Sequence, residues 1–255
     1  MTLSVIVITH NEAAVIARCL ESVAWADEII VLDSGSSDDT VAIARRHNAK
    51  VATAADWPGF GPQKNRALAL ATGDWVLALD ADEWVTAELR AGIERALASE
   101  NRRVAFRMPR RSSFCGHWMR HSGWWPDYVV RLFKRGAVHF SEDLVHERPL
   151  VNGATGTLSV PLMHEPIRDL DEALRKMNAY SSASATMLYR RGRQASLATA
   201  IGHGLWTFFR TYFLRLGFLD GRAGFMLAIS NAEGAYYRYL KLALNPAARP
   251  NSDLE

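Results

Sequence analysis

The sequence predicts an α/β fold in which a mostly parallel sheet carries helices on both faces. Three observations support this prediction. Short, apolar, β-branched runs alternate with helical patterns through the N-terminal third of the chain. The runs are continuously apolar, as strands buried on both faces are. Three of them end abruptly in polar or acidic residues, which belong at the carboxyl edge of such a sheet.

The first two strands come early in the chain. A strand is expected over residues 3–9, followed by a helix through about residue 23. A second strand is expected over residues 28–33. Gly35 permits a tight turn behind it, and neighbouring Ser and Asp side chains can cap a helix that runs to about residue 47.

Two further strands complete the predicted sheet. A weaker strand is expected over residues 50–53, followed by a loop with Pro and Gly over residues 57–62. The next helix is expected to open at residues 63–66 and to end at Thr72 and Gly73. A buried strand then leads into Asp80, and the strand–helix alternation is typical of a parallel sheet.

Polar residues follow three of the strands and should share one edge of the sheet. A carboxylate or amide there can hold a ribose and a base, although each of these residues could also simply cap the next helix. The residues are Thr9, Asn11, Glu12, Asp33, Asp80 and Asp82.

The acidic cluster Asp80, Asp82 and Glu83 predicts a cation site. Three carboxylates within four positions do not fit inside a strand that is buried on both faces, so they must follow the end of the strand. Hard oxygen ligands suit Mg2+ or Mn2+, and such an ion suits a diphosphate. The alternative is an ordinary strand followed by a solvated acidic turn, because a D-x-D tripeptide is a weak motif.

Composition favours one compact catalytic unit with a C-terminal extension. The 255 residues are 49% hydrophobic, and the formal net charge is +3. The two cysteines follow no metal or redox spacing. The N-terminus lacks the features of a signal peptide, so we expect a cytoplasmic catalytic part. No glycine follows the first strand, which disfavours a dehydrogenase or a sugar nucleotidyltransferase.

The middle of the chain is basic and aromatic. Aromatic rings stack on sugars and arginines bind phosphate, so this region suits a phosphorylated oligosaccharide acceptor. It carries no recognised nucleic-acid module, and its tryptophans could instead lie in the core. The residues are Arg107, Arg110, Arg111, Phe114, His117, Trp118, Arg120, His121, Trp124 and Trp125.

The last 60 or so residues predict two amphipathic helices. Apolar residues recur at helical spacing from Ile201 to Leu216, and a second segment runs from about Phe225 to Leu244. Neither has the uninterrupted apolar stretch of a spanning helix. Aromatic residues with arginines favour helices lying on an anionic membrane surface. The alternatives are packing on the catalytic part or a homo-oligomer contact.

Six segments, in this order and spacing, resemble the family 2 glycosyltransferases of the GT-A fold. Four carry the resemblance to the superfamily, and two indicate the bacterial branch that adds sugars to the lipopolysaccharide core as β-1,4-glucosyltransferases. The segments are SVIVITHNE, EIIVLDSGSSDDT, GPQKNRAL and GDWVLALDADE, then RLFKRGAVHFSEDLVHE and HGLWTFFRTYFLRLGFLDG.

The resemblance implies roles for residues near the nucleotide and the metal. Asp82 is expected to ligate Mg2+ or Mn2+ directly, Asp80 to lie nearer the ribose, and Glu83 to stand outside the ligands or at a helix start. His164 is the candidate for a further metal ligand, or else a buried, hydrogen-bonded histidine. The nucleotide contacts expected from the resemblance are Thr9, Asn11, Glu12, Asp33, Lys64 and Asn65.

An inverting transfer needs a carboxylate base opposite the leaving group. Glu142 and Asp143 resemble the E-D motif of the family, and Glu147 resembles the H-E motif of the branch. Glu147 is preferred and Asp143 follows closely, while a solvated acidic helix start is the alternative.

Together these observations predict an inverting hexosyltransferase. Its donor is a nucleotide-diphosphate sugar, expected to be UDP-glucose, and its acceptor a lipid-linked inner-core oligosaccharide of lipopolysaccharide at the inner face of the cytoplasmic membrane. Another lipid-linked or polysaccharide acceptor, or a non-catalytic carbohydrate-binding protein, is the alternative. Residues 1–100 are expected to bind the nucleotide sugar, 101–168 to bind acceptor and supply the base, and 169–255 to form the helical extension.

Overall fold

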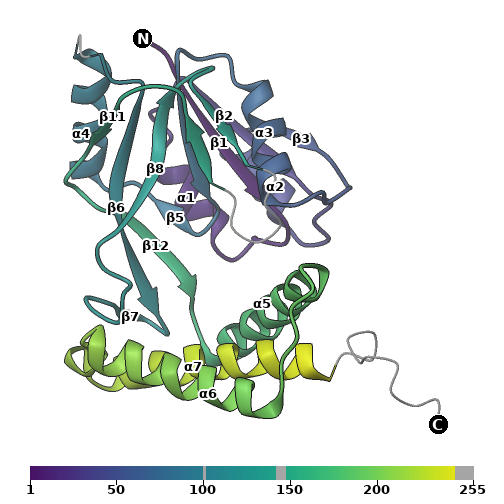
Figure 1. Cartoon of the computed structure of the whole chain (residues 1–255). Helices are drawn as coiled ribbons and strands as arrows, with labels where there is room; N and C mark the ends of the chain where they lie inside the picture. The colour runs from purple at the N-terminus through teal and green to yellow at the C-terminus, as the bar shows by residue number, and fades with distance from the viewer. Residues whose placement is uncertain (100–101, 142–147, 245–255) are drawn as a thin grey trace. The chain divides into compact units, whose positions relative to one another are not determined.

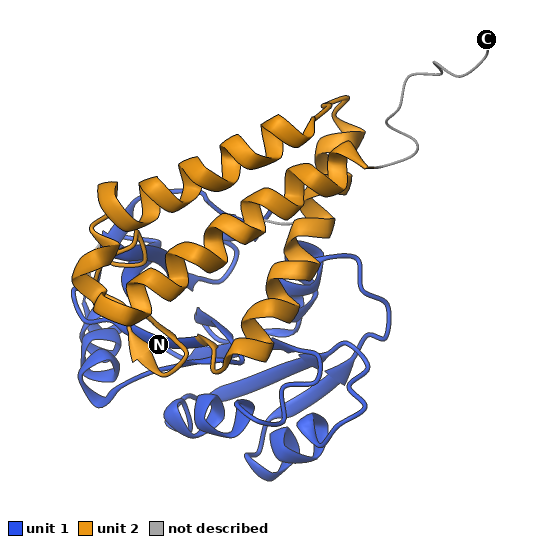
Figure 2. Ribbon diagram, turned by 90° about the horizontal axis from the view of Figure 1, so that it is seen from below, with its two compact units in different colours: residues 1–111, 126–165 blue, residues 112–125, 166–255 orange. Residues whose placement is uncertain are grey.

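The computed structural model describes residues 1–99, 102–141 and 148–244 (Figure 1). The chain divides into two compact units (Figure 2). Unit 1 consists of residues 1–111 and 126–165, and unit 2 of residues 112–125 and those from 166 onward.

The first four strands of unit 1 confirm the predicted parallel sheet. They are β1 (Leu3–Thr9), β2 (Glu28–Asp33), β3 (Lys50–Thr53) and β4 (Trp75–Asp80). Their order is β3-β2-β1-β4, and each neighbouring pair is parallel. Strands β2 and β3 therefore lie on one side of β1, and β4 lies on its other side. The strand order thus reverses between β1 and β4, which creates a switch point there.

The register of β1 aligns the polar strand ends along one edge. Thr9 lies opposite Asp33 of β2, and Ile8 lies opposite Asp80 of β4. The carboxyl ends of three strands therefore meet where an open α/β sheet offers its ligand crevice.

Helices cover both faces of the parallel strands (Figure 1). Val5 and Val7 of β1 belong to one core with residues of α1 (Ile16–Ser22) and α4 (Ala87–Ala98). Ala44 of α2 (Thr40–Arg46) belongs to the same core. Ile6, which lies between Val5 and Val7 and points to the other face of the sheet, belongs to a second core with Ala67 of α3 (Phe60–Leu70). Burial on both faces explains why the strands carry unbroken apolar runs.

Helix α3 begins three residues before the position expected from the sequence. It starts at Phe60 rather than Gln63 and ends at Leu70. Pro62 lies in the first turn, where backbone N–H groups have no partner within the helix, so its missing N–H costs nothing there.

The remaining strands extend the sheet beside β4, in the order β8-β6-β12-β5. The pairs β4–β8 and β6–β8 are antiparallel. Strands β7 and β11 pair with β6, and β9 and β10 form a separate two-stranded sheet. Their bounds are β5 Glu83–Trp84, β6 Ala105–Phe114, β7 His117–Trp118, β8 Asp127–Lys134, β9 Val138–Phe140, β10 Pro149–Val151, β11 Thr155–Thr157 and β12 Leu162–Ile167.

The described part of unit 2 contains three long helices, and α5 and α6 both pack against α7. Helix α5 covers Leu170–Arg190, α6 covers Leu197–Phe209 and α7 covers Gly221–Ala243. A π-helical turn, η1 (Arg210–Leu214), and a 3-10 turn, η2 (Gly217–Asp220), connect α6 to α7. Among the described residues, no helix has both the length and the apolar character needed to cross a membrane.

The basic and aromatic region is divided between the two units. Arg107 and Arg110 belong to unit 1, whereas residues 112–125 belong to unit 2. The prediction that the ring of Phe114 stacks on a sugar is wrong, because this side chain is buried in a cluster with Met119. Its ring packs edge-on against that of Trp124, with the ring centroids 6.0 Å apart.

Candidate functional site

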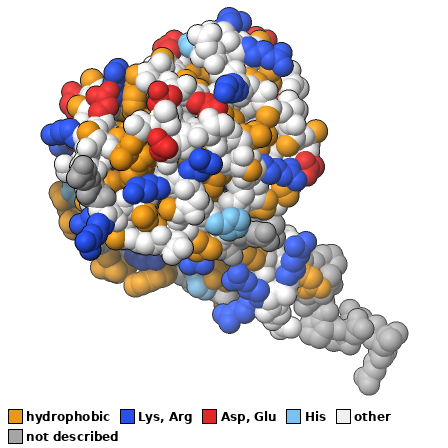
Figure 3. All heavy atoms as spheres, turned by 90° about the horizontal axis from the view of Figure 1, so that it is seen from above, with side chains coloured by type: hydrophobic (Ala, Val, Ile, Leu, Met, Phe, Trp, Pro, Cys, Tyr) orange, Lys and Arg blue, Asp and Glu red, His pale blue; other side chains and the backbone are white. Residues whose placement is uncertain are grey.

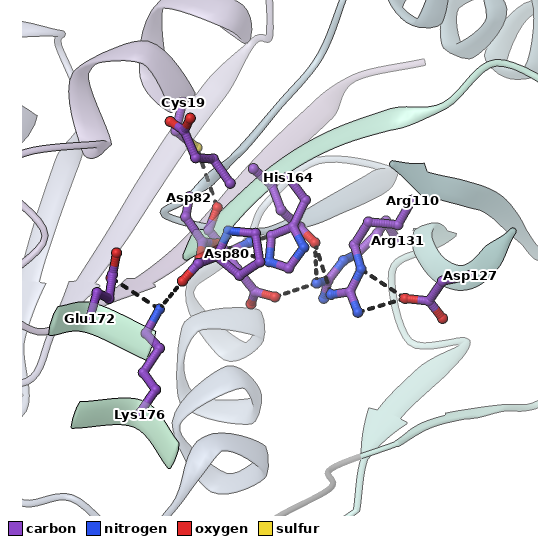
Figure 4. A network of polar contacts seen from close by, with 12 residues as sticks. Cys19, Asp80, Asp82, Arg110, Asp127, Arg131, His164, Glu172 and Lys176 are labelled. Atoms are coloured by element: carbon purple, nitrogen blue, oxygen red, sulfur yellow. Dashed lines mark hydrogen bonds and ion pairs between the residues drawn. The ribbon is translucent and has the colours of Figure 1, made fainter. Parts of the chain in front are cut away.

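Asp80 lies between two cations at the end of β4. Its Oδ1 atom is 2.9 Å from Nζ of Lys64, and its Oδ2 atom accepts a hydrogen bond from Arg131 (Figure 4). Lys64 comes from the second turn of α3, and Arg131 comes from β8. Both cationic side chains are buried, while the side chain of Asp80 keeps 31% of its surface exposed. The carboxylate is therefore held in place yet remains accessible.

The surrounding charges fix the ionisation of Asp80 and Arg131. Burial alone would raise the pKa of Asp80, but the charges of Arg131 and Lys64 outweigh it and hold that pKa well below its usual range. Burial alone would lower the pKa of Arg131, but Asp80 and Glu83 raise it instead. The Asp80 carboxylate therefore stays negatively charged and the Arg131 guanidinium beside it stays positively charged.

Glu83 is a buried anchor rather than a helix-start residue. Its side chain is fully buried, and its Oε1 atom lies 2.6 Å from Nη2 of Arg131 and 3.4 Å from Nη1 of Arg110. Its Oε2 atom accepts a hydrogen bond of 3.1 Å from the N–H of Asp80. Helix α4 begins only at Ala87, with Thr86 as its N-cap. Glu83 therefore shapes the turn that presents Asp80 and Asp82.

Arg110 extends the same network away from β4. Its Nη2 atom lies 2.7 Å from Oδ2 of Asp127, and its Nε atom donates to the same oxygen at 3.0 Å (Figure 4). Burial alone would lower the pKa of Arg110, but Glu83 and Asp127 raise it, while the nearby charge of Arg131 opposes them. Arg110 is thus engaged with carboxylates of its own unit.

The structure brings Asp82 and His164 together. Strand β12 pairs antiparallel with β5, which aligns His164 with Glu83 and lets the N–H of Glu165 donate to the carbonyl of Asp82. As a result, Nε2 of His164 lies 3.5 Å from Oδ1 of Asp82. The two side chains keep 11% and 20% of their surfaces exposed, respectively. Within the described ranges, no group of three or more His, Cys, Asp and Glu side chains is placed to hold a metal ion.

At the ends of β1 and β2, Asp33 organises the turn that follows it. Its Oδ1 atom accepts hydrogen bonds from Thr9 at 3.1 Å and from the Ser36 hydroxyl at 2.5 Å. Its Oδ2 atom accepts the N–H groups of Gly35 at 3.0 Å and Ser36 at 2.8 Å. Gly35 adopts φ +84°, a left-handed conformation that glycine tolerates best. Asp33 and Thr9 are both buried, so they hold the shape of this edge.

Asn11 and Glu12 tie the loop after β1 to the loop after β2. The Asn11 side chain accepts the N–H of Ser37 at 2.8 Å, and the N–H of Asn11 donates to the Ser36 hydroxyl at 2.8 Å. The N–H of Glu12 donates to the Thr40 hydroxyl, also at 2.8 Å. The two loops therefore form one cross-linked wall beside the β1–β4 switch point.

Asn65 binds a backbone segment instead of standing at the start of a helix. Its side-chain amide donates to the carbonyl of Phe140 at 2.8 Å and accepts the N–H of Phe140 at 2.9 Å. Phe140 ends β9, just before the segment that carries the expected bases. Glu142, Asp143 and Glu147 themselves lie outside the described residues.

Sequence reasoning missed Arg131, which contacts both Asp80 and Glu83. One signal could have revealed it: Arg131 is the only charged residue between Tyr128 and Phe133 in an apolar run. An arginine inside a buried strand needs carboxylate partners, and the acidic cluster after β4 is the obvious source.

Together, the sheet edge presents a positioned carboxylate and a carboxylate–imidazole pair. Oxygen and imidazole nitrogen atoms can both ligate Mn2+-type ions, and a fixed carboxylate such as Asp80 can accept hydrogen bonds from hydroxyl groups. The arrangement thus suits a polar, hydroxyl-rich ligand with a diphosphate.

Comparison with known proteins agrees with this geometry. The family described as glycosyl transferase family 2 matches residues 4–149. The chain is 30% identical to the lipopolysaccharide core biosynthesis glycosyltransferase LpsC of Rhizobium meliloti, with 99% of this chain and 97% of LpsC covered.

Two solved structures share the fold. The S. aureus TarS fragment 1–349 in complex with UDP-GlcNAc has a TM-score of 0.50 at 15% identity and covers 95% of this chain and 89% of that one. The mannosyltransferase PcManGT from Pyrobaculum calidifontis, in complex with GDP-Man and Mn2+, has a TM-score of 0.50 at 18% identity, covering 91% and 73%. The GT-A fold expected from the sequence is thereby confirmed, and the chain belongs to glycosyl transferase family 2.

Proposed function

We propose that this glycosyltransferase is an inverting, metal-dependent hexosyltransferase that uses a UDP-sugar, with UDP-glucose as the first candidate. Its acceptor would be an inner-core oligosaccharide of lipopolysaccharide. Full-length similarity to LpsC supports the acceptor class. The nucleotide sugars bound by TarS and PcManGT, and the Mn2+ bound by PcManGT, support the donor class and a divalent ion.

The observation that carries the proposal is the Asp82–His164 pair beside Asp80. Neighbouring ligands of an octahedral ion lie about 3 Å apart, so two ligand atoms 3.5 Å apart, Oδ1 and Nε2, suit one face of Mg2+ or Mn2+. The diphosphate and water would supply the other ligands, as is usual for such ions. When bound, the ion would neutralise the charge that develops on the departing diphosphate.

Asp80 would have a different task. Two cations already hold its oxygens, and its exposed portion can accept a hydrogen bond from a ribose hydroxyl. The wall built from Thr9, Asn11, Glu12 and Asp33 would flank the ribose and base on the other side of the switch point. Lys64 would act through Asp80, which it fixes, because its Nζ atom lies 2.9 Å from that carboxylate.

The base would come from the segment after Phe140. Glu147 is our first candidate, with Asp143 and then Glu142 behind it, and all three lie outside the described residues. The base would take the proton from the acceptor hydroxyl as that oxygen attacks the anomeric carbon opposite the diphosphate. Asn65 would set the start of this segment through its two hydrogen bonds to Phe140.

A lipid-linked acceptor would place the enzyme at the inner face of the cytoplasmic membrane, either as single chains or as a homo-oligomer. Another lipid-linked or polysaccharide acceptor is the second candidate in the same class. A non-catalytic carbohydrate-binding protein is the candidate outside it, and it would bind sugars without releasing UDP.

The test is UDP release and transfer to truncated core oligosaccharides, measured with a panel of UDP-sugars with and without Mn2+. We expect activity that needs the ion and is abolished in Asp82→Asn. Asp171→Asn, an exposed carboxylate in the first turn of α5, is the matched control and should behave like the wild type. Normal turnover and melting of Asp82→Asn would refute the proposed metal site, and absence of UDP release with every donor would favour the carbohydrate-binding protein.

A further inference from the structure

We infer that the connection between α6 and α7 inserts into the surface of a bilayer rich in anionic phospholipid. We call residues 205–226 the apolar corner. The inference rests on the proposed lipid-linked acceptor, but it names a surface and a lipid chemistry that the transfer reaction does not require.

The apolar corner exposes large apolar side chains at high density. Leu205 and Trp206 at the end of α6, Phe213 and Leu214 in η1, and Phe218 and Leu219 in η2 each expose between 44% and 68% of their surface. Large exposed apolar patches mark interaction surfaces in soluble proteins. Its mixture of tryptophan, phenylalanine and leucine is typical of helices that lie at the boundary between headgroups and acyl chains.

Ring contacts around the half-buried Tyr212 hold the exposed residues in place. The ring of Tyr212 lies 5.5 Å from that of Phe208 in α6, 5.5 Å from that of Phe225 in α7 and 6.3 Å from that of Phe218 in η2. These contacts join all the elements of the corner. The exposed rings therefore project from a built support rather than from a loose loop.

Leu216 has a strained backbone at the turn between η1 and η2, where its N–H donates to the carbonyl of Phe213 and its carbonyl accepts the N–H of Leu219. Leu216 adopts φ +56°, a left-handed conformation that is unusual for a bulky residue. Its side chain is nevertheless 45% exposed, so core packing does not compensate for the strain. Strain of this kind concentrates at functional sites, and here it presents one more apolar side chain to the surroundings.

Charge selects an anionic bilayer as the partner. Arg210, Arg215 and Arg222 are exposed within the apolar corner. Its only acidic residue, Asp220, is buried, and its carboxylate accepts the N–H groups of Arg120 at 3.0 Å and His121 at 2.9 Å. Three cations around exposed aromatic rings match the headgroup layer of an anionic leaflet.

Other partners fit the corner less well. A second copy seated symmetrically on it would bring the same three arginines toward each other, which is a like-charge contact. The face of the molecule in Figure 3 is different in kind, because acidic and basic side chains are interspersed over it. The combination of dense apolar exposure with one sign of charge thus points to lipid.

The test is flotation of the full chain with phosphatidylcholine vesicles, with or without phosphatidylglycerol. We expect flotation mainly with the mixed vesicles. The double variant Phe213→Ser/Phe218→Ser removes two inserted rings and should lower the partition coefficient at least about tenfold. Leu70→Ser, an equally exposed leucine of α3, is the matched control and should leave it unchanged.

A second pair of variants tests the charge independently of the apolar contacts. Arg210→Glu/Arg222→Glu should abolish the preference for phosphatidylglycerol, whereas Arg46→Glu at the end of α2 should not. Equal flotation of the wild type and both double variants would overturn the inference. So would a wild-type dimer that Phe213→Ser/Phe218→Ser dissociates while vesicle binding is absent.

Hydrolysis of the UDP-sugar in solution separates this inference from the proposed function. The corner variants should hydrolyse the donor at the wild-type rate, because none of the changed residues belongs to the site at the sheet edge. A wild type that hydrolyses UDP-sugar but never floats would leave the transferase proposal standing and end the membrane inference. A wild type that floats as expected but hydrolyses no donor would leave the membrane inference standing and end the transferase proposal.

Discussion

Nη2 of Arg131 lies 2.6 Å from Oε1 of Glu83, and both side chains are buried. The same guanidinium contacts Asp80, and Glu83 accepts the N–H of Asp80. One buried ion pair therefore fixes both the side chain and the backbone of the first aspartate in the D-x-D motif. The position of Asp80 is a property of the folded protein before any ligand arrives.

Arg131→Met should be strongly destabilising, because it leaves Glu83 buried without its closest cation. Breaking a buried ion pair costs about 3–5 kcal/mol. Urea denaturation would measure the loss. The double variant Arg131→Met/Glu83→Leu should recover part of it, since apolar residues can replace a buried pair.

Arg107→Met is the matched control for this change. Arg107 is exposed on the adjacent strand β6 and makes a side-chain hydrogen bond of 3.1 Å to Thr157, so its removal should cost less than about 1 kcal/mol. Equal losses for the Arg107 and Arg131 variants would show that the pair with Glu83 has no special role.

Asn65→Ala distinguishes two roles for this residue. If Asn65 positions the segment after Phe140, turnover should fall by a factor of about ten or more while the affinity for the donor stays nearly constant. If it instead touches the nucleotide, as the family resemblance implies, donor affinity should fall. Calorimetric titration with UDP, together with steady-state kinetics, separates the two, and we expect the first result because of its paired hydrogen bonds.

Glu147→Gln should lower turnover by a factor on the order of 10² or more with little change in donor affinity, because only proton removal is impaired. Asp143→Asn should have a smaller effect. If the two variants exchange these behaviours, Asp143 is the base.

The lowered pKa of Glu28 predicts how the stability of the fold depends on pH. Burial alone would raise its pKa, but hydrogen bonds from Lys50, Ser4 and Thr72 outweigh it and lower the pKa from 4.5 to about 2. Because the pKa is depressed in the folded protein, the stabilisation is complete above 4.5 and disappears as the pH falls through about 2. It amounts to about 3 kcal/mol.

Glu28→Gln should therefore lower the free energy of unfolding by about 3 kcal/mol near pH 7, with the difference vanishing toward pH 2. Urea denaturation across this range would measure it. Glu94→Gln, which disrupts an exposed ion pair with Arg90, should change stability by less than about 1 kcal/mol. A Glu28→Gln difference that does not vary with pH would contradict the pKa assignment.

The parallel half of the sheet was predictable because its signal is local. Strands β1, β2 and β4 are apolar, short and buried on both faces, and each ends in polar residues that mark the carboxyl edge. Their alignment follows from parallel pairing alone, which is why the sequence placed Thr9, Asp33 and Asp80 together.

The antiparallel half was harder to predict because its information is long-range. Strand β8 carries Arg131 to a carboxylate 48 positions earlier in the chain, and β12 brings His164 beside Asp82 by pairing with a strand of two residues. Neither strand has a strict apolar alternation. Helix α5 lies within the helical extension expected over residues 169–255, but its bounds were not predicted, although Asp169 caps it by accepting the N–H of Glu172 at 2.8 Å.

Calorimetric titration of UDP into the wild type and Asp82→Asn, with Mn2+ present or chelated, measures whether an ion held by Asp82 takes part in donor binding. We predict that chelation weakens binding of UDP to the wild type at least about tenfold, and that Asp82→Asn binds UDP weakly in both conditions. Binding that is equally tight with and without the ion, and unchanged in Asp82→Asn, would show that Asp82 holds no ion that binds the diphosphate.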